Sequence, residues 1–115
     1  MRTRITRSFS FEAAHQLPRH PGKCRRLHGH HYRLAVTVEG PVGENGMVVD
    51  FADLEEVVDR EVVQRWDHRC LNEFLDNPTA ELVAAEAWTL LGKAGLALVG
   101  LRLWETPDSS VELQA

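Results

Sequence analysis

HGHHYRLAVTV, residues 28–38, alternates between two kinds of side chain along its whole length. Because successive side chains of a β-strand point to opposite faces, this period of two predicts a half-buried strand. The face expected to meet the core holds the even positions, His28, His30, Tyr32, Leu34, Val36 and Val38. A long turn is predicted to follow the strand at Gly40, Pro41, Gly43, Asn45 and Gly46.

The preceding segment, residues 2–15, alternates in the same way. Its apolar residues and one histidine share a parity, namely Ile5, Phe9, Phe11, Ala13 and His15. Pro18, Pro21 and Gly22 mark a loop that runs to about Leu27. Strands that follow one another along the chain usually lie side by side, so we expect these two to pair.

From residue 50 the apolar period becomes that of a helix. Asp50 can cap a helix that runs to about Arg65, and Asn77-Pro78 predicts an N-cap followed by proline at the first position of a second helix. Gly92 and Gly95 end that helix, and strands are predicted over residues 96–105 and 111–114. The order strand, strand, helix, helix, strand, strand predicts an α+β fold, a four-stranded antiparallel sheet with both helices on one face.

Length and composition narrow the class of protein. The 115 residues are expected to form one domain, residues 1–115, and no apolar run approaches the length of about 20 residues that a membrane helix needs. The N-terminus lacks the apolar segment of a signal peptide, so a cytoplasmic location is expected. A net charge of −4 argues against general nucleic-acid binding.

The positive charge is nevertheless concentrated. Arg19, Lys23, Arg25 and Arg26 lie within eight residues, with His20 among them. One interpretation is a solvated loop. The other is a local anion site on an acidic protein, which would suit a phosphorylated small molecule.

Three histidines are in phase with the core faces of the first two strands. His28 and His30 lie two apart and point the same way, and His15 ends the strand expected beside them. Three neutral imidazoles suit zinc with its fourth position open, although a single histidine is more often a satisfied half-buried residue. His20 lies in the loop and His31 points to the opposite face, so both are poorer candidates.

Cys24 and the dipeptide Asp67-His68 have reactive side chains whose neighbours indicate a catalytic role. Cys24 is flanked by cations, which lower a thiol pKa and predict a nucleophile or base; the alternative is a small buried side chain. Asp67-His68 is the pairing that orients a general acid or base, although such dipeptides are more often surface residues. Core packing is the expected role of Cys70.

The third predicted strand ends with a carboxylate. Glu105 continues the phase of Val99, Leu101 and Leu103. If the strand continues to this point, the carboxylate lies on an apolar face and needs a partner, which we expect to be a ligand. If the strand has already ended, Glu105 turns into solvent.

Several motifs together resemble the 6-pyruvoyltetrahydropterin synthase family. They are FEAAH at 11–15, C-x-x-x-HGHHY at 24–32, GMVVDF at 46–51, DHRCLN at 67–72, NPTAE at 77–81 and ET at 105–106. They occur in the family's order and cover almost the whole chain.

The resemblance implies a tunnelling fold that assembles into an oligomeric barrel, usually a homohexamer of two trimers with active sites between subunits. It implies zinc at His15, His28 and His30, and Cys24 as the catalytic thiol. It further implies Asp67 and His68 as the proton-transfer pair and Glu105 as the anchor of the pterin ring. Thr79 and Glu81 match a motif near the pterin pocket. The partner would be a small pterin triphosphate.

The family contains two reactions on 7,8-dihydroneopterin triphosphate. The bacterial branch, in queuosine synthesis, makes 6-carboxy-5,6,7,8-tetrahydropterin and releases acetaldehyde. Its cysteine precedes HGH by four positions, as Cys24 precedes His28, so the spacing favours this lyase. The alternatives are the 6-pyruvoyltetrahydropterin synthase reaction, which eliminates triphosphate, and a non-catalytic zinc-binding assembly module.

Overall fold

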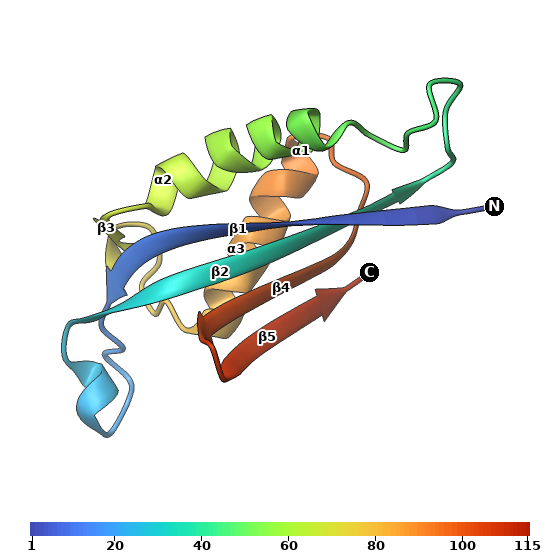
Figure 1. Cartoon of the computed structure of the whole chain (residues 1–115). Helices are drawn as coiled ribbons and strands as arrows, with labels where there is room; N and C mark the ends of the chain where they lie inside the picture. The colour runs from blue at the N-terminus through green and yellow to red at the C-terminus, as the bar shows by residue number, and fades with distance from the viewer.

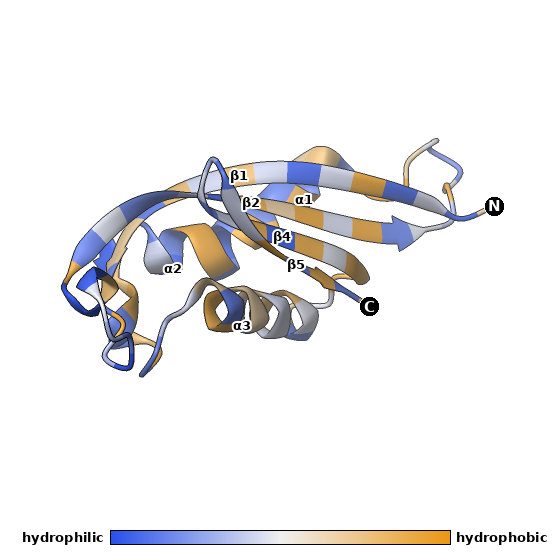
Figure 2. Ribbon diagram, turned by 90° about the horizontal axis from the view of Figure 1, so that it is seen from below, coloured by the Kyte–Doolittle hydropathy of each residue, from blue (hydrophilic) through white to orange (hydrophobic).

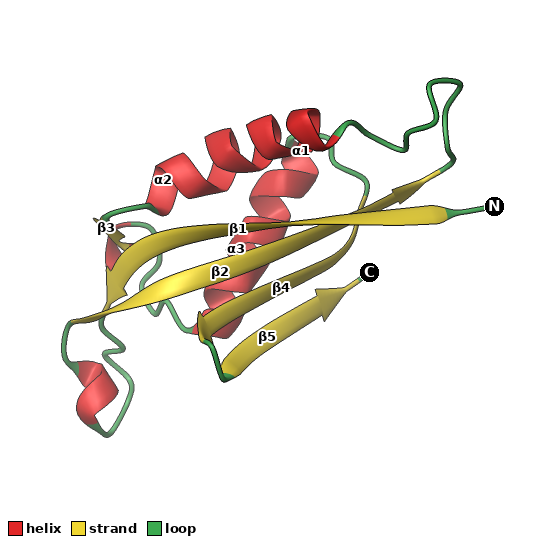
Figure 3. Ribbon diagram, viewed as in Figure 1, coloured by secondary structure: helices red, strands yellow, loops and turns green.

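The computed structural model describes residues 1–115 as one layer of strands covered by helices (Figure 1). Two long strands come first and pair with each other, and two further strands end the chain (Figure 3). In chain order the elements are β1 (Thr3–His15), β2 (His28–Gly40), α1 (Phe51–Val58), α2 (Gln64–Trp66), β3 (Arg69–Cys70), α3 (Ala80–Lys93), β4 (Leu98–Thr106) and β5 (Ser109–Gln114). No helix is both long enough and apolar enough to cross a bilayer.

The predicted α+β fold is confirmed, with one strand more than expected. The sheet has the order β3-β1-β2-β4-β5, and the four long strands pair antiparallel. The additional strand, β3, is parallel to β1 and pairs only Arg69 with Ala13 and Cys70 with Ala14. Two residues are too few to produce a recognisable period, so the sequence predicted four strands where the structure has five.

The core lies between one face of the sheet and the helices, as the alternation predicts. Figure 2 shows the strands as bands of hydrophilic and hydrophobic residues, with the helices on one side. On β1, β2 and β4 the buried hydrophobic residues are Phe11, Ala13, Tyr32, Leu34, Val36, Val38, Leu101 and Leu103. They pack against Leu54, Val58, Val62, Val83, Ala84, Ala87 and Leu91 of the helical layer.

One helix boundary agrees with the prediction and one differs. The first helical segment ends at Trp66, in agreement with the predicted end at about Arg65, and has a wider π-helical turn over Asp59–Val63 between α1 and α2. The second helix is capped by Thr79 instead of Asn77, because the extended backbone of Thr79 leaves Pro78 outside the helix. The Thr79 hydroxyl accepts a hydrogen bond of 3.2 Å from the Leu82 N–H.

Candidate active site

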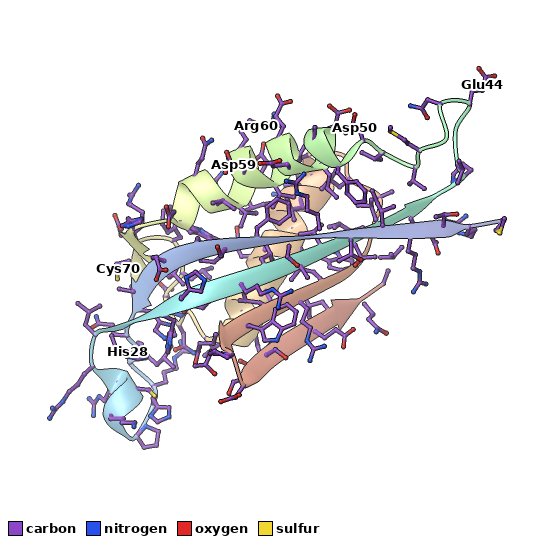
Figure 4. The ribbon with its side chains drawn as sticks, viewed as in Figure 1. His28, Glu44, Asp50, Asp59, Arg60 and Cys70 are labelled. Atoms are coloured by element: carbon purple, nitrogen blue, oxygen red, sulfur yellow. The ribbon has the colours of Figure 1, made fainter.

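Three imidazoles converge where β1 ends and β2 begins. The antiparallel register places His15 opposite His28, and His30 opposite Ala13 on the same face. One nitrogen from each of the three rings lies within 4.8 Å of the others, so the predicted triad is brought together and can hold a metal ion. Figure 4 shows His28 at the end of the molecule opposite Glu44.

Hydrogen bonds to backbone carbonyls determine which nitrogens of the triad carry protons. His15 Nδ1–H donates to the carbonyl of Pro78 at 2.8 Å, and His28 Nδ1–H donates to the carbonyl of Arg26 at 2.7 Å. In the neutral rings both Nε2 atoms are therefore unprotonated, and they face each other at 3.0 Å. His30 Nε2 is buried without any hydrogen-bond partner. Two facing lone pairs and one orphaned nitrogen fit a shared cation.

Glu105 lies at the edge of the triad. Its carboxylate oxygens are 3.7 Å from His30 Nε2 and 3.9 Å from His15 Nε2. β4 continues to Thr106, with a register shift between Trp104 and Thr106, and the Glu105 side chain is half-buried beside the triad, so the strand has not ended before Glu105 as the solvent alternative required. Burial lowers the pKa of His30, with Glu105 opposing the shift, so the neutral imidazole that a metal requires is favoured.

The Asp67–His68 pair is held by the backbone of β1. Asp67 Oδ2 lies 3.0 Å from His68 Nδ1, and Asp67 Oδ1 accepts a hydrogen bond of 2.8 Å from the Glu12 N–H. The pKa of Asp67 is lowered first by this N–H and then by His68. The His68 N–H donates to the Glu12 carbonyl at 2.6 Å, which supports its left-handed backbone with φ of 59°. An ionised carboxylate thus orients an exposed imidazole.

One cavity connects this pair with the triad. Its lining includes both His30 and His68, together with Glu12, His31 and Cys70. A second cavity of about 820 Å³ includes Glu105, His30 and Trp104, which is within the size range of small-molecule sites. His31 lines both cavities and pairs with the carboxylate of Glu12 across the strands, on the face opposite the triad as predicted.

The two cysteines lie in different surroundings. Cys24 is half-buried in a short 3-10 helix over Lys23–Arg25, and it lines neither cavity beside His30. Cys70 is not a core residue, which corrects the prediction. It lies on the sheet-edge strand β3, where it remains half-buried, and its thiol donates to Asn72 Oδ1 at 3.5 Å. Figure 4 shows it beside the end of β1.

The NPTAE motif contacts the triad through its backbone. Thr79 caps α3, Glu81 is exposed on the first turn, and neither lines the two cavities beside His30. The Pro78 carbonyl is the group that orients His15. Sequence reasoning missed this contact and that of the Arg26 carbonyl, because a carbonyl group is common to all residues and gives no signal in the sequence.

The chain is similar to several known proteins over nearly its full length. The sequence model of the family "6-pyruvoyl tetrahydropterin synthase" matches residues 4–115. A 6-carboxy-5,6,7,8-tetrahydropterin synthase from Synechocystis sp. is 46% identical, covering 92% of this chain and 88% of that protein. A dihydroneopterin monophosphate aldolase from Pyrococcus furiosus is 40% identical over 99% of each chain. The structure of Caenorhabditis elegans 6-pyruvoyl tetrahydropterin synthase has a TM-score of 0.89 at 28% identity, covering 100% of this chain and 96% of that one.

Proposed function

The chain belongs to the 6-pyruvoyl tetrahydropterin synthase family, and we propose that it is a zinc-dependent 6-carboxy-5,6,7,8-tetrahydropterin synthase of queuosine biosynthesis. It would convert 7,8-dihydroneopterin triphosphate and water into 6-carboxy-5,6,7,8-tetrahydropterin, acetaldehyde and triphosphate. The four-residue spacing from Cys24 to His28 supports this reaction. The name of the Synechocystis relative supports it as well.

The observation that carries the proposal is the protonation pattern of the triad. Both Nδ1–H groups of His15 and His28 are used by carbonyls, and their Nε2 atoms meet at 3.0 Å beside the orphaned Nε2 of His30. Three neutral imidazoles are one of the donor sets that catalytic zinc sites use. When bound, zinc supplies a Lewis acid that polarises oxygen atoms of the substrate.

The remaining residues would position the substrate and move protons. Asp67 holds a proton on His68 Nδ1, which leaves His68 Nε2 free to accept and return one. The Cys24 thiol would serve as the second proton-transfer group. Glu105 would accept the ring N–H and the amino group of the pterin, with the cavity beside Trp104 receiving the ring. Glu81, exposed on α3, is a proposed further ligand contact.

We further propose that the complete site forms between subunits of a homo-oligomer, expected to be a hexamer. Within one chain Cys24 lines neither cavity that His30 lines. Both edges of the sheet have backbone available for pairing, since β3 covers only Ala13 and Ala14 of β1 and β5 pairs only with β4. Such edges readily pair with another strand.

Thr79 would contribute to the pterin pocket by fixing the start of α3.

Product analysis tests the proposed reaction. Purified, zinc-loaded protein is incubated with 7,8-dihydroneopterin triphosphate, and the pterin and any aldehyde are identified. Acetaldehyde with 6-carboxytetrahydropterin supports the proposal, whereas 6-pyruvoyltetrahydropterin identifies the alternative reaction. Because the Pyrococcus furiosus relative is named as an aldolase of the monophosphate, that substrate is tested in parallel. No turnover of either would favour the non-catalytic assembly module.

A further inference from the structure

The loop between β1 and β2 carries a group of cations without counterions. Its four basic residues are exposed, and none of them forms an ion pair. They are Arg19, Lys23, Arg25 and Arg26. From Ala13 to Val38 the chain contains no aspartate or glutamate. In a protein with a net charge of −4, this loop is a local excess of positive charge.

Three of the four cations share one hollow. Lys23, Arg25 and Arg26 line a cavity of about 670 Å³ together with Pro21 and Gly22. Arg19 lines a different cavity, whose other charged residues are Asp76 and Glu86. The structure thus separates three cations that face one space from a fourth that lies among carboxylates. A space lined by cations and lacking any carboxylate suits an anion with several charges.

Backbone hydrogen bonds hold this part of the loop in shape. The N–H groups of Arg25 and Arg26 donate to the carbonyls of Gly22 and Lys23 at 3.2 Å and 3.0 Å. The Leu17 N–H donates to the Cys24 carbonyl at 3.0 Å, and the Gly22 N–H donates to His20 Nδ1 at 2.9 Å. A preorganised backbone reduces the conformational entropy lost when a ligand binds.

The cationic hollow is linked to the triad through one residue, Arg26. The Arg26 carbonyl accepts the hydrogen bond from His28 Nδ1–H at 2.7 Å, while the side chain of the same residue lines the hollow. Figure 1 shows the loop projecting beyond the end of the sheet where β1 ends and β2 begins. The hollow and the triad thus lie at the same end of the sheet, which is the arrangement expected for a ligand that reacts at the triad and carries a charged tail.

We infer that Lys23, Arg25 and Arg26 form an oligophosphate site, which holds the triphosphate of the substrate and favours it over a monophosphate. The link to a pterin substrate rests on the proposed function, whereas binding of the phosphate chain does not. Guanidinium and ammonium groups bind phosphate oxygens through charge-assisted hydrogen bonds. One phosphate can engage only part of this set, while a chain of three can engage all three cations.

Calorimetric titration of inorganic triphosphate and of orthophosphate into the full chain tests the inference. The variants are the triple substitution Lys23→Ala, Arg25→Ala, Arg26→Ala and the matched single substitution Arg19→Ala. The wild type should bind triphosphate about tenfold or more tightly than orthophosphate, and the triple variant should lose about tenfold or more of that affinity. Arg19→Ala should stay within about twofold. Equal affinity in the wild type and the triple variant would overturn the inference, as would an equal loss in both variants.

Two controls distinguish the phosphate site from binding at the histidine triad and from the proposed reaction. Triphosphate also chelates metals, so the titration is repeated on the double variant His28→Ala, His30→Ala. If this double variant still binds triphosphate, the site in the loop is supported. If the double variant loses affinity for triphosphate while the triple variant retains it, the site in the loop is overturned. The titration does not require turnover. If the wild type binds triphosphate through the loop but makes no product, the phosphate site is supported and only the proposed reaction is refuted. Active protein whose triple variant keeps its KM for the triphosphate substrate refutes only this site.

Discussion

Removal of the zinc ion proposed for the triad should lower the melting temperature of this chain by about 10 °C. Without a cation, the Nε2 atoms of His15 and His28 face each other at 3.0 Å and neither has a proton to share. A ligand that binds only the folded state stabilises it by about 2.7 kcal/mol when present at about 100 times its Kd. For a domain near this size, each kcal/mol shifts Tm by about 4 °C, which gives the expected change.

Scanning calorimetry of zinc-loaded and chelator-treated protein measures this shift. His31→Ala is the matched control, because His31 is an exposed histidine on the opposite face of β2, and it should show the same shift as the wild type. His30→Ala removes one member of the triad, so chelation should hardly change its Tm. Identical melting of loaded and metal-free wild type, or a full shift in His30→Ala, would refute the assignment of the triad.

Five further outcomes are expected from the site and the residues that support it. Cys24→Ala should fold and bind metal but lose turnover, whereas Cys70→Ala should keep most of its activity; equal losses measured by product formation would contradict these roles. Glu105→Ala should retain its metal content and weaken pterin binding about tenfold or more in a product titration, because it removes two charge-assisted hydrogen bonds. Asp67→Asn should lower kcat by about 10²-fold or more. Because the pKa of Asp67 is lowered, its carboxylate is fully ionised and paired with His68 above the ordinary carboxyl pKa. The pairing is lost only as the pH falls through the lowered value. A decrease of the wild-type rate at mildly acidic pH should therefore not arise from protonation of Asp67. Thr79→Ala should cost about 1 kcal/mol of unfolding free energy in denaturant titrations, because it removes an N-cap, and an unchanged midpoint would show that the cap is dispensable.

The sequence predicted the long strands and the triad because both depend on a period of two. Once residues 2–15 and 28–38 alternate, the antiparallel pairing brings His15 opposite His28, and His30 must share their face. The strand phase also placed Glu105 on the core face, where the structure confirms it beside the triad. The positions of these residues could be predicted from the local alternation of side chains and from the pairing of neighbouring strands.

The errors arose where long-range contacts override local signals. β3 forms only because the chain after α2 passes along the edge of β1, and this placement also leaves Cys70 half-buried instead of in the core. Asn77-Pro78 has a typical helix-start pattern, but the Pro78 carbonyl is used by His15 and α3 begins after Thr79. A contact between positions 63 residues apart has no local signature.

The contacts of Glu12 with the Asp67–His68 pair determine which substitutions position 12 tolerates. Its N–H and its carbonyl hold the pair, while its own carboxylate points away to His31. Main-chain groups are common to almost every amino acid, so a substitution of this side chain leaves both hydrogen-bonding groups available to the pair. Proline is the exception, because it lacks the N–H that Asp67 accepts. The geometry of the Asp67–His68 pair thus depends on the backbone at position 12 and not on the identity of its side chain.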